Sequence, residues 1–257
     1  MNGAYELGAV SLRAQQRALE THANNVANIN TPGFKREEVQ FSEIVSTGGN
    51  PLTENERLAS QSSAQNGGVR MATRVMLSDH GELQATGSTL DLAIDGAGFI
   101  ELMGQDGETF LWRGGKLEID RDRMLAAQGL SPLRANIIVP EDTRALSIAA
   151  DGTVQAEVEA GELMEIGQIM LVRQQADSDL IPMGAGQYRL ADGALAVDAV
   201  PGEDGVGFIR QGMIEQSNVE MTEAMVEMLI LQRAYSASAQ VIQTADQVAS
   251  ITNSLSR

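Results

Sequence analysis

Histidine and cysteine, which are common nucleophiles, general bases and transition-metal ligands, are almost absent from this chain of 257 residues. His22 and His80 are the two histidines, and cysteine is absent, so a thiolate nucleophile, a disulfide and a cysteine zinc site are all unavailable. The motifs H-E-x-x-H and G-x-S-x-G do not occur. We expect both histidines to be solvated, one on a helix and one in a turn. The sequence therefore predicts a protein that is not an enzyme and that uses no metal or cofactor.

Two weaker chemical signals, a glycine pair and an excess of acids, do not change this prediction. Gly96-Ala-Gly98 is similar to part of a nucleotide-binding loop, but the third glycine, the following helix and a P-loop lysine are missing, which favours a turn between strands. The 35 acidic residues outnumber the 18 basic ones and give a formal net charge of -17. Nucleic-acid phosphates and anionic membranes select the opposite charge. We expect neither nucleic acid nor a small-molecule substrate as a partner.

The elements that must position the remaining side chains begin with a helix predicted from residue 1 to about residue 30. Tyr5, Leu12, Leu19 and Val26 recur every seven residues, which predicts one narrow apolar seam along this helix. The helix should end before Pro32, because proline cannot continue a helix and disfavours helical geometry in the residue before it.

A second helix is predicted from about Val219 to Leu255, and at 1.5 Å per residue it would be roughly 55 Å long. Ser217 or Asn218 is placed to cap its start. Apolar residues repeat every seven positions in two stripes, the first with Met221, Met228, Tyr235 and Ile242, and the second with Ala234, Val241, Val248 and Leu255. Periodicity alone leaves two interpretations open. The helix packs on its own domain, or it forms a coiled coil with the N-terminal helix while its second stripe meets neighbouring subunits.

The middle of the chain alternates short apolar runs with glycine turns, a pattern that is typical of β-strands. The candidate strands are LDLAI, FIEL, TFLW, NIIVP, ALSIAA, TVQAEV, IGQIMLV and QYRLA. Asp106-Gly107 and Asp151-Gly152 suit the hairpin turns between them. Before these strands, the polar and turn-rich residues from about 46 to 68 predict an exposed loop.

The predicted fold class is α+β, with long N- and C-terminal helices that form a coiled-coil domain, an inserted mostly-β domain and an extended loop. The predicted domains are an N-terminal helix at 1–33, a linker and loop region at 34–86, a β-rich domain at 87–210, and a C-terminal helix at 211–257 that packs with the first.

Two runs of residues, one near each end of the chain, form recognisable signatures. Ala23-Asn-Asn-Val-Ala-Asn-Ile-Asn-Thr-Pro-Gly-Phe-Lys35 is similar to ANNxANxxTxGFKR, the N-terminal signature of the flagellar rod and hook family. Gly212-Met-Ile-Glu-Gln-Ser-Asn-Val219, followed by QRAY and IQTAD in the predicted helix, is similar to its C-terminal signature. A central stretch, LDLAIDGAGF, resembles the distal-rod branch of the family. Two segments depart from the family pattern: Phe99-Ile100 stands where two aromatics are common, and Phe110-Leu-Trp-Arg-Gly114 stands where a Tyr-Thr-Arg-x-Gly turn is common. These departures leave a proximal rod subunit open.

The resemblance implies a structural subunit of the bacterial flagellar basal-body rod, which polymerises helically through its terminal helices and transmits torque. It also implies export through the flagellar type III apparatus without a cleaved signal, and a location in the periplasm. The first twenty residues lack a secretory-signal pattern and would by themselves predict a cytoplasmic protein. The expected partners are further copies of the chain, other rod and hook proteins, the surrounding ring proteins and the export apparatus.

The expected assembly interface combines the two signatures with the seven-residue seams. The amides of Asn24, Asn25 and Asn28 donate and accept hydrogen bonds together, and we expect them to fix the register between packed segments. The complete set is Tyr5, Leu12, Leu19, Asn24, Asn25, Val26, Asn28, Thr31, Pro32, Gly33, Phe34, Ser217, Asn218, Met221, Met228, Gln232, Arg233, Tyr235, Ile242 and Asp246.

Two other classes of function compete with the rod subunit. A secreted β-domain that binds a ligand would use the middle region but would leave both terminal helices without a role. A secreted hydrolase would need a pocket with converging titratable groups, and the sequence names none.

Overall fold

The computed structural model describes residues 2–43, 69–77, 79–104, 107–158, 161–174, 180–184, 186–191, 194 and 196–255. The loop predicted at about 46–68 lies outside the described residues. The chain divides into two compact units. The first comprises Met1–Ala23, Glu38–Arg74 and Met225–Arg257, and the second comprises Asn24–Glu37 and Val75–Ala224.

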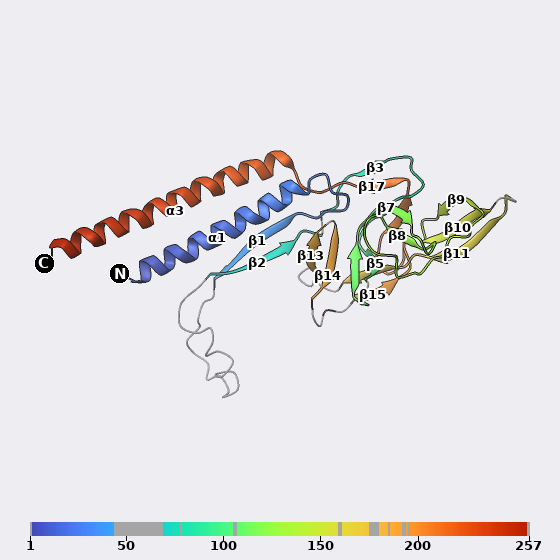
Figure 1. Cartoon of the computed structure of the whole chain (residues 1–257), viewed down its shortest axis with the longest axis horizontal. Helices are drawn as coiled ribbons and strands as arrows, with labels where there is room; N and C mark the ends of the chain where they lie inside the picture. The colour runs from blue at the N-terminus through green and yellow to red at the C-terminus, as the bar shows by residue number, and fades with distance from the viewer. Residues whose placement is uncertain are drawn as a thin grey trace, which may run out of the picture. The chain divides into compact units, whose positions relative to one another are not determined.

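The first unit contains most of two terminal helices and a two-stranded sheet (Figure 1). Helix α1 spans Asn2–Ala27 and helix α3 spans Met221–Leu255, while strand β1 (Glu37–Glu43) pairs with β2 (Val69–Val75). The helices run antiparallel beside each other, so the start of α1 and the end of α3 lie at the same end of the pair. Gln15 Nε2 donates to Ser238 Oγ at 3.1 Å, and His22 Nδ1 lies 3.1 Å from Glu227 Oε2. His22 is therefore half-buried against a carboxylate rather than freely solvated.

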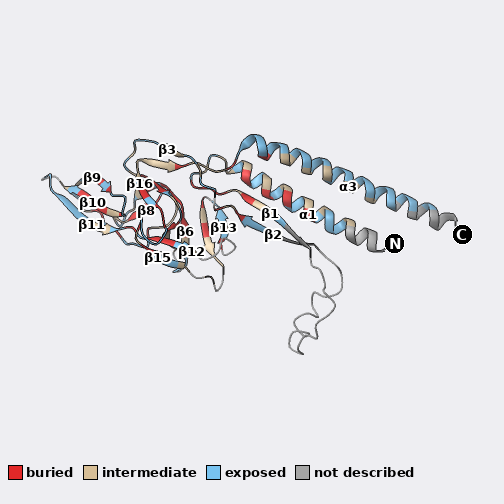
Figure 2. Ribbon diagram, turned by 180° about the vertical axis from the view of Figure 1, so that it is seen from behind, coloured by how far each residue is buried: buried red, intermediate tan, exposed pale blue. Residues whose placement is uncertain are grey.

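The prediction of a coiled-coil domain is wrong, because the helices do not meet through the expected seam of large apolar side chains. On α1 the buried residues include Ala14 and Ala18, whereas Leu12 and Leu19 are only half-buried. On α3 most of the surface is exposed, including the predicted seam residue Tyr235 (Figure 2). A coiled coil requires large knobs that insert into holes at every seam position. Small buried residues and polar side-chain contacts take their place here.

The second unit holds four antiparallel sheets among its described residues. The six-stranded sheet has the order β13 (Leu180–Gly184), β14 (Gln187–Leu190), β6 (Thr109–Trp112), β5 (Phe99–Met103), β12 (Leu171–Gln174) and β15 (Ala196–Ala199). The four-stranded sheet has the order β16 (Phe208–Gln211), β4 (Asp91–Asp95), β7 (Gly114–Ile119) and β8 (Leu125–Ala127). A three-stranded sheet joins β11 (Leu163–Gln168), β10 (Thr153–Val158) and β9 (Thr143–Ile148), and β17 (Met213–Glu215) pairs with β3 (Leu83–Ala85).

The six-stranded sheet is covered on both faces, because neighbouring residues of β5 belong to different cores. Ile100 lies in the main core with Leu92 and Leu171, whereas Phe99 lies in a second core with Leu111. Adjacent apolar residues such as Phe99 and Ile100, rather than an alternation of apolar and polar ones, are what a strand buried on both faces requires.

Two of the predicted glycine turns are confirmed. Gly96 and Gly98 have φ of 123° and 117° and form the turn between β4 and β5, and Gly152 at φ 86° turns between β9 and β10. The turn predicted at Asp106-Gly107 lies partly outside the described residues.

One predicted strand, NIIVP, is wrong. Asn136 has φ of 52°, a left-handed conformation that interrupts extended backbone, and Ile138 makes only an isolated bridge to Met124. Turning to the helices, none in the described part of the chain is long and apolar enough to cross a lipid bilayer.

Candidate functional site

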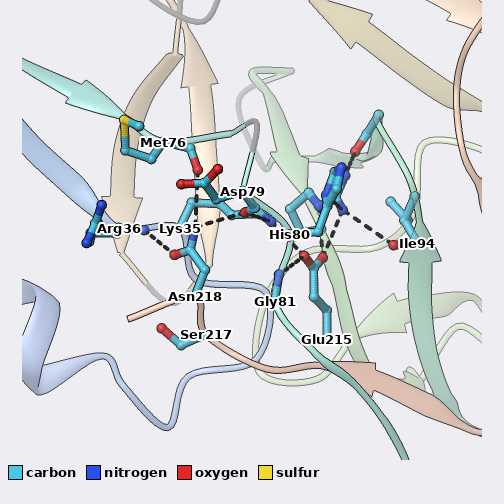
Figure 3. Close-up of polar contacts among 12 residues, drawn as sticks. Lys35, Arg36, Met76, Asp79, His80, Gly81, Ile94, Glu215, Ser217 and Asn218 are labelled. Atoms are coloured by element: carbon cyan, nitrogen blue, oxygen red, sulfur yellow. Dashed lines mark hydrogen bonds and ion pairs between the residues drawn. The ribbon is translucent and has the colours of Figure 1, made fainter. Parts of the chain in front are cut away.

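The two signature segments come together in the second unit, where they meet the β-sheets. We name this region the signature junction and define it by Asn25, Lys35, Arg113, Glu215 and Asn218. All five residues lie in the second unit, although they are far apart in sequence. Figure 3 shows the polar contacts at its centre.

The chain leaves α1 through a turn that requires glycine. Thr31 N and Asn28 Nδ2 donate to Asn28 O and Asn24 O respectively, which satisfies groups at the end of the helix. Gly33 then adopts φ of 67° and donates its N–H to Glu215 O at 2.8 Å. A Cβ at this position would lie 2.9 Å from Arg113 Cβ. The glycine thus brings the N-terminal signature against both the C-terminal signature and the β-sheets.

Asn25 ties the end of α1 to the start of β1 with two hydrogen bonds. Its Nδ2 donates to Glu37 O at 2.8 Å, and its Oδ1 accepts from Glu37 N at 2.9 Å. The side chain is 1% exposed, so both bonds form away from water. The asparagines were expected to connect packed segments, and the partner of this one is the backbone of β1.

Asn218 makes the matching connection from the C-terminal signature. Its Oδ1 accepts from Arg36 N at 2.6 Å, and its Nδ2 donates to Asp79 O at 2.9 Å and to Met76 O at 3.2 Å (Figure 3). It therefore does not cap α3. The side chain of Ser217 takes a local role instead, since its Oγ accepts from Val219 N at 3.3 Å.

A buried carboxylate between two cations forms the centre of the junction. Glu215 Oε1 accepts from Lys35 Nζ at 2.6 Å, and Glu215 Oε2 accepts from Arg113 Nη2 at 2.9 Å and Nε at 3.1 Å. The side chains of Lys35 and Glu215 are 1% exposed and that of Arg113 is 3% exposed. Arg113 also donates to Gly98 O at 2.6 Å and lies over the Phe99 ring at 5.6 Å. The carboxylate holds together three segments of the chain.

The charges of the junction control one another. Burial alone would raise the pKa of Glu215, but Arg113 and Lys35 outweigh it and hold that pKa below the usual range. Burial and then the charge of Arg113 lower the pKa of Lys35. His80 lies 3.5 Å from Arg113 Nη2, and burial followed by the charge of Lys35 lowers its pKa. The lowered pKa favours the neutral imidazole of His80, and the two ion pairs of Glu215 connect the segments that carry Lys35 and Arg113. Within the described ranges, no three side chains converge to hold a metal ion.

The remaining predicted interface residues differ in how far they are buried. Phe34 is buried with Val219 and Ala224 in a small apolar cluster, against which Val26 packs. Leu12, Leu19, Met228 and Ile242 are half-buried on the helices, whereas Met221, Gln232, Arg233 and Tyr235 are exposed. Thr31 is half-buried and donates to Asn28 Oδ1, and Pro32 is exposed. The side chains of Tyr5 and Asp246 lie outside the described residues.

Sequence reasoning missed the three ionic residues of the junction. Lys35 and Glu215 were present in the signatures, and each directly follows an apolar residue, Phe34 or Ile214, which is an available signal. Arg113 directly follows TFLW and precedes two glycines. The last two residues of β6 are buried, so a charged residue that directly follows them usually needs a partner of opposite charge.

We expect Asn25→Ala to lower the free energy of unfolding by about 1–3 kcal/mol, because two buried backbone groups of Glu37 lose their partners. Gln16→Ala, which removes an exposed amide from the same helix, should change it by less than about 0.5 kcal/mol. Urea unfolding of both variants measures the difference. Equal stabilities would show that Asn25 does not hold β1 to α1.

Family models match three parts of this chain. They are "Flagella basal body rod protein" at residues 9–35, "Flagellar hook protein FlgE/F/G D1 domain" at 93–156, and "Flagellar basal body rod FlgEFG protein C-terminal" at 210–255. The first and last matches contain the two segments that meet at the signature junction.

Curated relatives match over nearly the whole chain. "Flagellar basal-body rod protein FlgG" of Borreliella burgdorferi is 33% identical and covers 97% of both chains. Proteins of the same name from Agrobacterium fabrum and Bacillus subtilis are 31% and 32% identical, covering 96% and 94% of this chain and 97% and 94% of their own. The resemblance to the flagellar rod and hook family is confirmed, and the chain belongs to the family of flagellar basal-body rod proteins FlgG.

Proposed function

We propose that this chain is a structural subunit of the flagellar basal-body rod, placed in its distal part, and that it polymerises through its terminal helices. The rod role is supported by relatives that are named as rod proteins and that match this chain over 94–97% of their length. The observation that carries the assembly role is an exposed apolar stripe on α3.

We name this surface the α3 stripe and define it by Val226, Leu229, Ile230 and Val241. These residues are 51%, 55%, 60% and 66% exposed. Leu229, Ile230 and Val241 follow Val226 by three, four and fifteen residues, which places all four on one side of the helix. Apolar side chains gathered on one exposed helix face mark a surface that associates with another protein. Further copies of the chain are the partner that a polymer would supply.

The signature junction supports the same role from within the subunit. A polymer that transmits torque needs subunits whose own chain segments are held firmly together. Asn25, Asn218 and the buried Glu215 connect both signature segments to the β-sheets by hydrogen bonds and ion pairs. The residues expected at the interface that are exposed on α3, namely Met221, Gln232, Arg233 and Tyr235, are then available to neighbouring subunits.

The location and the further partners follow from the rod role and belong to the same proposal. The subunit is exported through the flagellar type III apparatus and assembles in the periplasm with other rod and hook proteins, inside the surrounding ring proteins. It works by assembly and not by catalysis.

Sedimentation of the purified chain over a range of concentrations, followed by electron microscopy of the pellet, tests polymerisation. We expect tubular polymers above a critical concentration. Hydrogen exchange should show amides of 225–255 that are protected in the polymer and exchange faster in the monomer. A chain that remains monomeric at every concentration, with both helices fully protected, would contradict the proposal.

The variant Leu229→Asp should raise the critical concentration at least about tenfold, because a carboxylate would have to be buried in the contact. Leu229→Met keeps an apolar side chain and should polymerise as the unaltered chain does. Both monomers should unfold with unchanged free energy, since the position is exposed. Normal assembly of Leu229→Asp would exclude the α3 stripe as an interface.

A further inference from the structure

A cavity in the second unit has a carboxylate in its wall. The cavity has a volume of about 220 Å³ and is lined by Asn24, Phe34, Glu37, Pro182, Gly184 and Tyr188, among others. This volume is far above the roughly 10–15 Å³ that one water molecule needs. Glu37 is 6% exposed, so its carboxyl group is almost entirely withdrawn from solvent.

Among the described residues, Glu37 has a polar partner but no counter-ion. Asn24 Nδ2 donates to Glu37 Oε1 at 3.1 Å, and no cationic side chain among the described residues pairs with this carboxylate. Lys35, two residues away, is committed to Glu215 and to Asp79 O. Tyr188 is the titratable side chain that shares the cavity, and burial raises its pKa, so it is uncharged at neutral pH. Burial likewise raises the pKa of Glu37. A cation placed beside this buried carboxyl group would stabilise its ionised form.

Arg233, on the surface of α3, carries the charge that is complementary to Glu37. It is exposed, and no carboxylate among the described residues pairs with it. Ile230 and Leu229, three and four residues before it, belong to the α3 stripe, so Arg233 lies on the same face of the helix. The positions three and four residues after it are Ser236 and Ala237, so none of these four neighbours along the helix is an acid. When this face is covered by another subunit, the guanidinium loses water and needs an anion.

The apolar surroundings of the two charges also match. Ile181 and Met183, on either side of Pro182 in the edge strand β13, are exposed at 37% and 51%. Leu229 and Ile230 provide exposed apolar surface one helical turn from Arg233. An arginine is suited to such a site, because its planar fork can donate two parallel hydrogen bonds to one carboxylate.

We propose that Arg233 of one copy enters the Glu37 cavity of a second copy and pairs with its carboxylate. This inference rests on the proposed polymerisation and adds the contact that would set the register between subunits. Apolar contacts of the α3 stripe bury surface between two subunits but allow one subunit to slide along the other. One buried ion pair in a cavity allows a single relative position of the two subunits. The exposed arginines of α1, Arg13 and Arg17, are the alternative cations.

A double-mutant cycle in the polymerisation assay tests the pair. We expect Glu37→Gln and Arg233→Gln each to raise the critical concentration about tenfold or more, and the double variant to be no worse than either single one. Glu37→Gln keeps the size of the side chain and an acceptor for Asn24, so the fold is retained. Arg17→Gln is the matched control, and its effect should simply add to that of Glu37→Gln.

The stability of the monomer separates this role from a structural one. A raised pKa in the folded state means that the folded chain binds the proton more tightly, so stability is lost as pH rises through that pKa. Glu37→Gln should therefore leave the monomer equally or more stable at neutral pH while it weakens assembly. If Glu37 were needed only for the fold, monomer stability and assembly would fall together.

The outcomes are distinguishable. Absence of polymers in the unaltered chain would refute the proposed function itself. Normal polymers of Glu37→Gln would overturn the ion pair and leave the polymerisation proposal standing. Coupling of Glu37 to Arg17 in place of Arg233 would overturn the assignment of the arginine.

Discussion

Glu215→Gln is expected to lower the free energy of unfolding by about 3–5 kcal/mol at neutral pH. The substitution removes the carboxylate between Lys35 and Arg113 and leaves two buried cations without their anion. Glu223→Gln is the matched control, because the Glu223 side chain is 51% exposed and pairs with Arg36 at the surface, where an ion pair contributes at most about 1 kcal/mol. Urea unfolding of both variants and of the unaltered chain provides the measurement.

The effect of Glu215→Gln should also depend on pH in a defined direction. The pKa of Glu215 is lowered in the folded state, so its stabilising contribution is complete above the ordinary carboxyl pKa and is lost as pH falls through the folded value. The difference between the unaltered chain and Glu215→Gln should therefore shrink on acidification. A difference that stayed constant at every pH would mean that size or shape, and not charge, explains the loss.

Phe34→Ala should be about as damaging, with an expected loss of about 3–5 kcal/mol in the free energy of unfolding. Phe34 is 3% exposed and fills a small cluster with Val219 and Ala224, so the truncation leaves a cavity between the two signature segments. Phe208→Ala removes an identical side chain that is 47% exposed and should cost far less. Thermal unfolding compares the pair. Similar losses for both variants would show that the cluster does not hold the signature segments together.

Much of the local structure could be predicted because it depends on residues near one another in sequence. The end of α1 before Pro32 and the turn at Gly96 and Gly98 follow from backbone preferences of single residues. Most strands of the β-rich region could also be predicted, from short apolar runs separated by glycine turns. The error at NIIVP arose because its composition favours a strand, while the left-handed conformation of Asn136 prevents one.

The coiled coil and the ionic centre could not be predicted for a different reason. Seven-residue spacing identifies a repeating stripe but does not say whether that stripe is buried, and on this chain the half-buried Leu19 lies beside the buried Ala18. The centre of the junction joins residues 180 and 102 positions apart, Lys35 and Arg113 with Glu215. No pattern in a single sequence specifies contacts at such separations. The exposure of the α3 stripe has the same origin, since it depends on which face the rest of the unit leaves uncovered.

The backbone bond between Gly33 and Glu215 has a consequence for how this fold can diversify. Gly33 N donates to Glu215 O, and Asn218 N donates to Phe34 O, so the backbones of the two signature segments, both in the second unit, are hydrogen-bonded to each other. The chain between these two hydrogen-bonded segments therefore forms a loop whose two ends are held together. Insertions or deletions along that loop, such as in the three-stranded sheet of β9, β10 and β11, change its length without moving either end. The hydrogen-bonded ends of the loop can therefore stay the same in related chains while the sheets between them grow, shrink or are replaced.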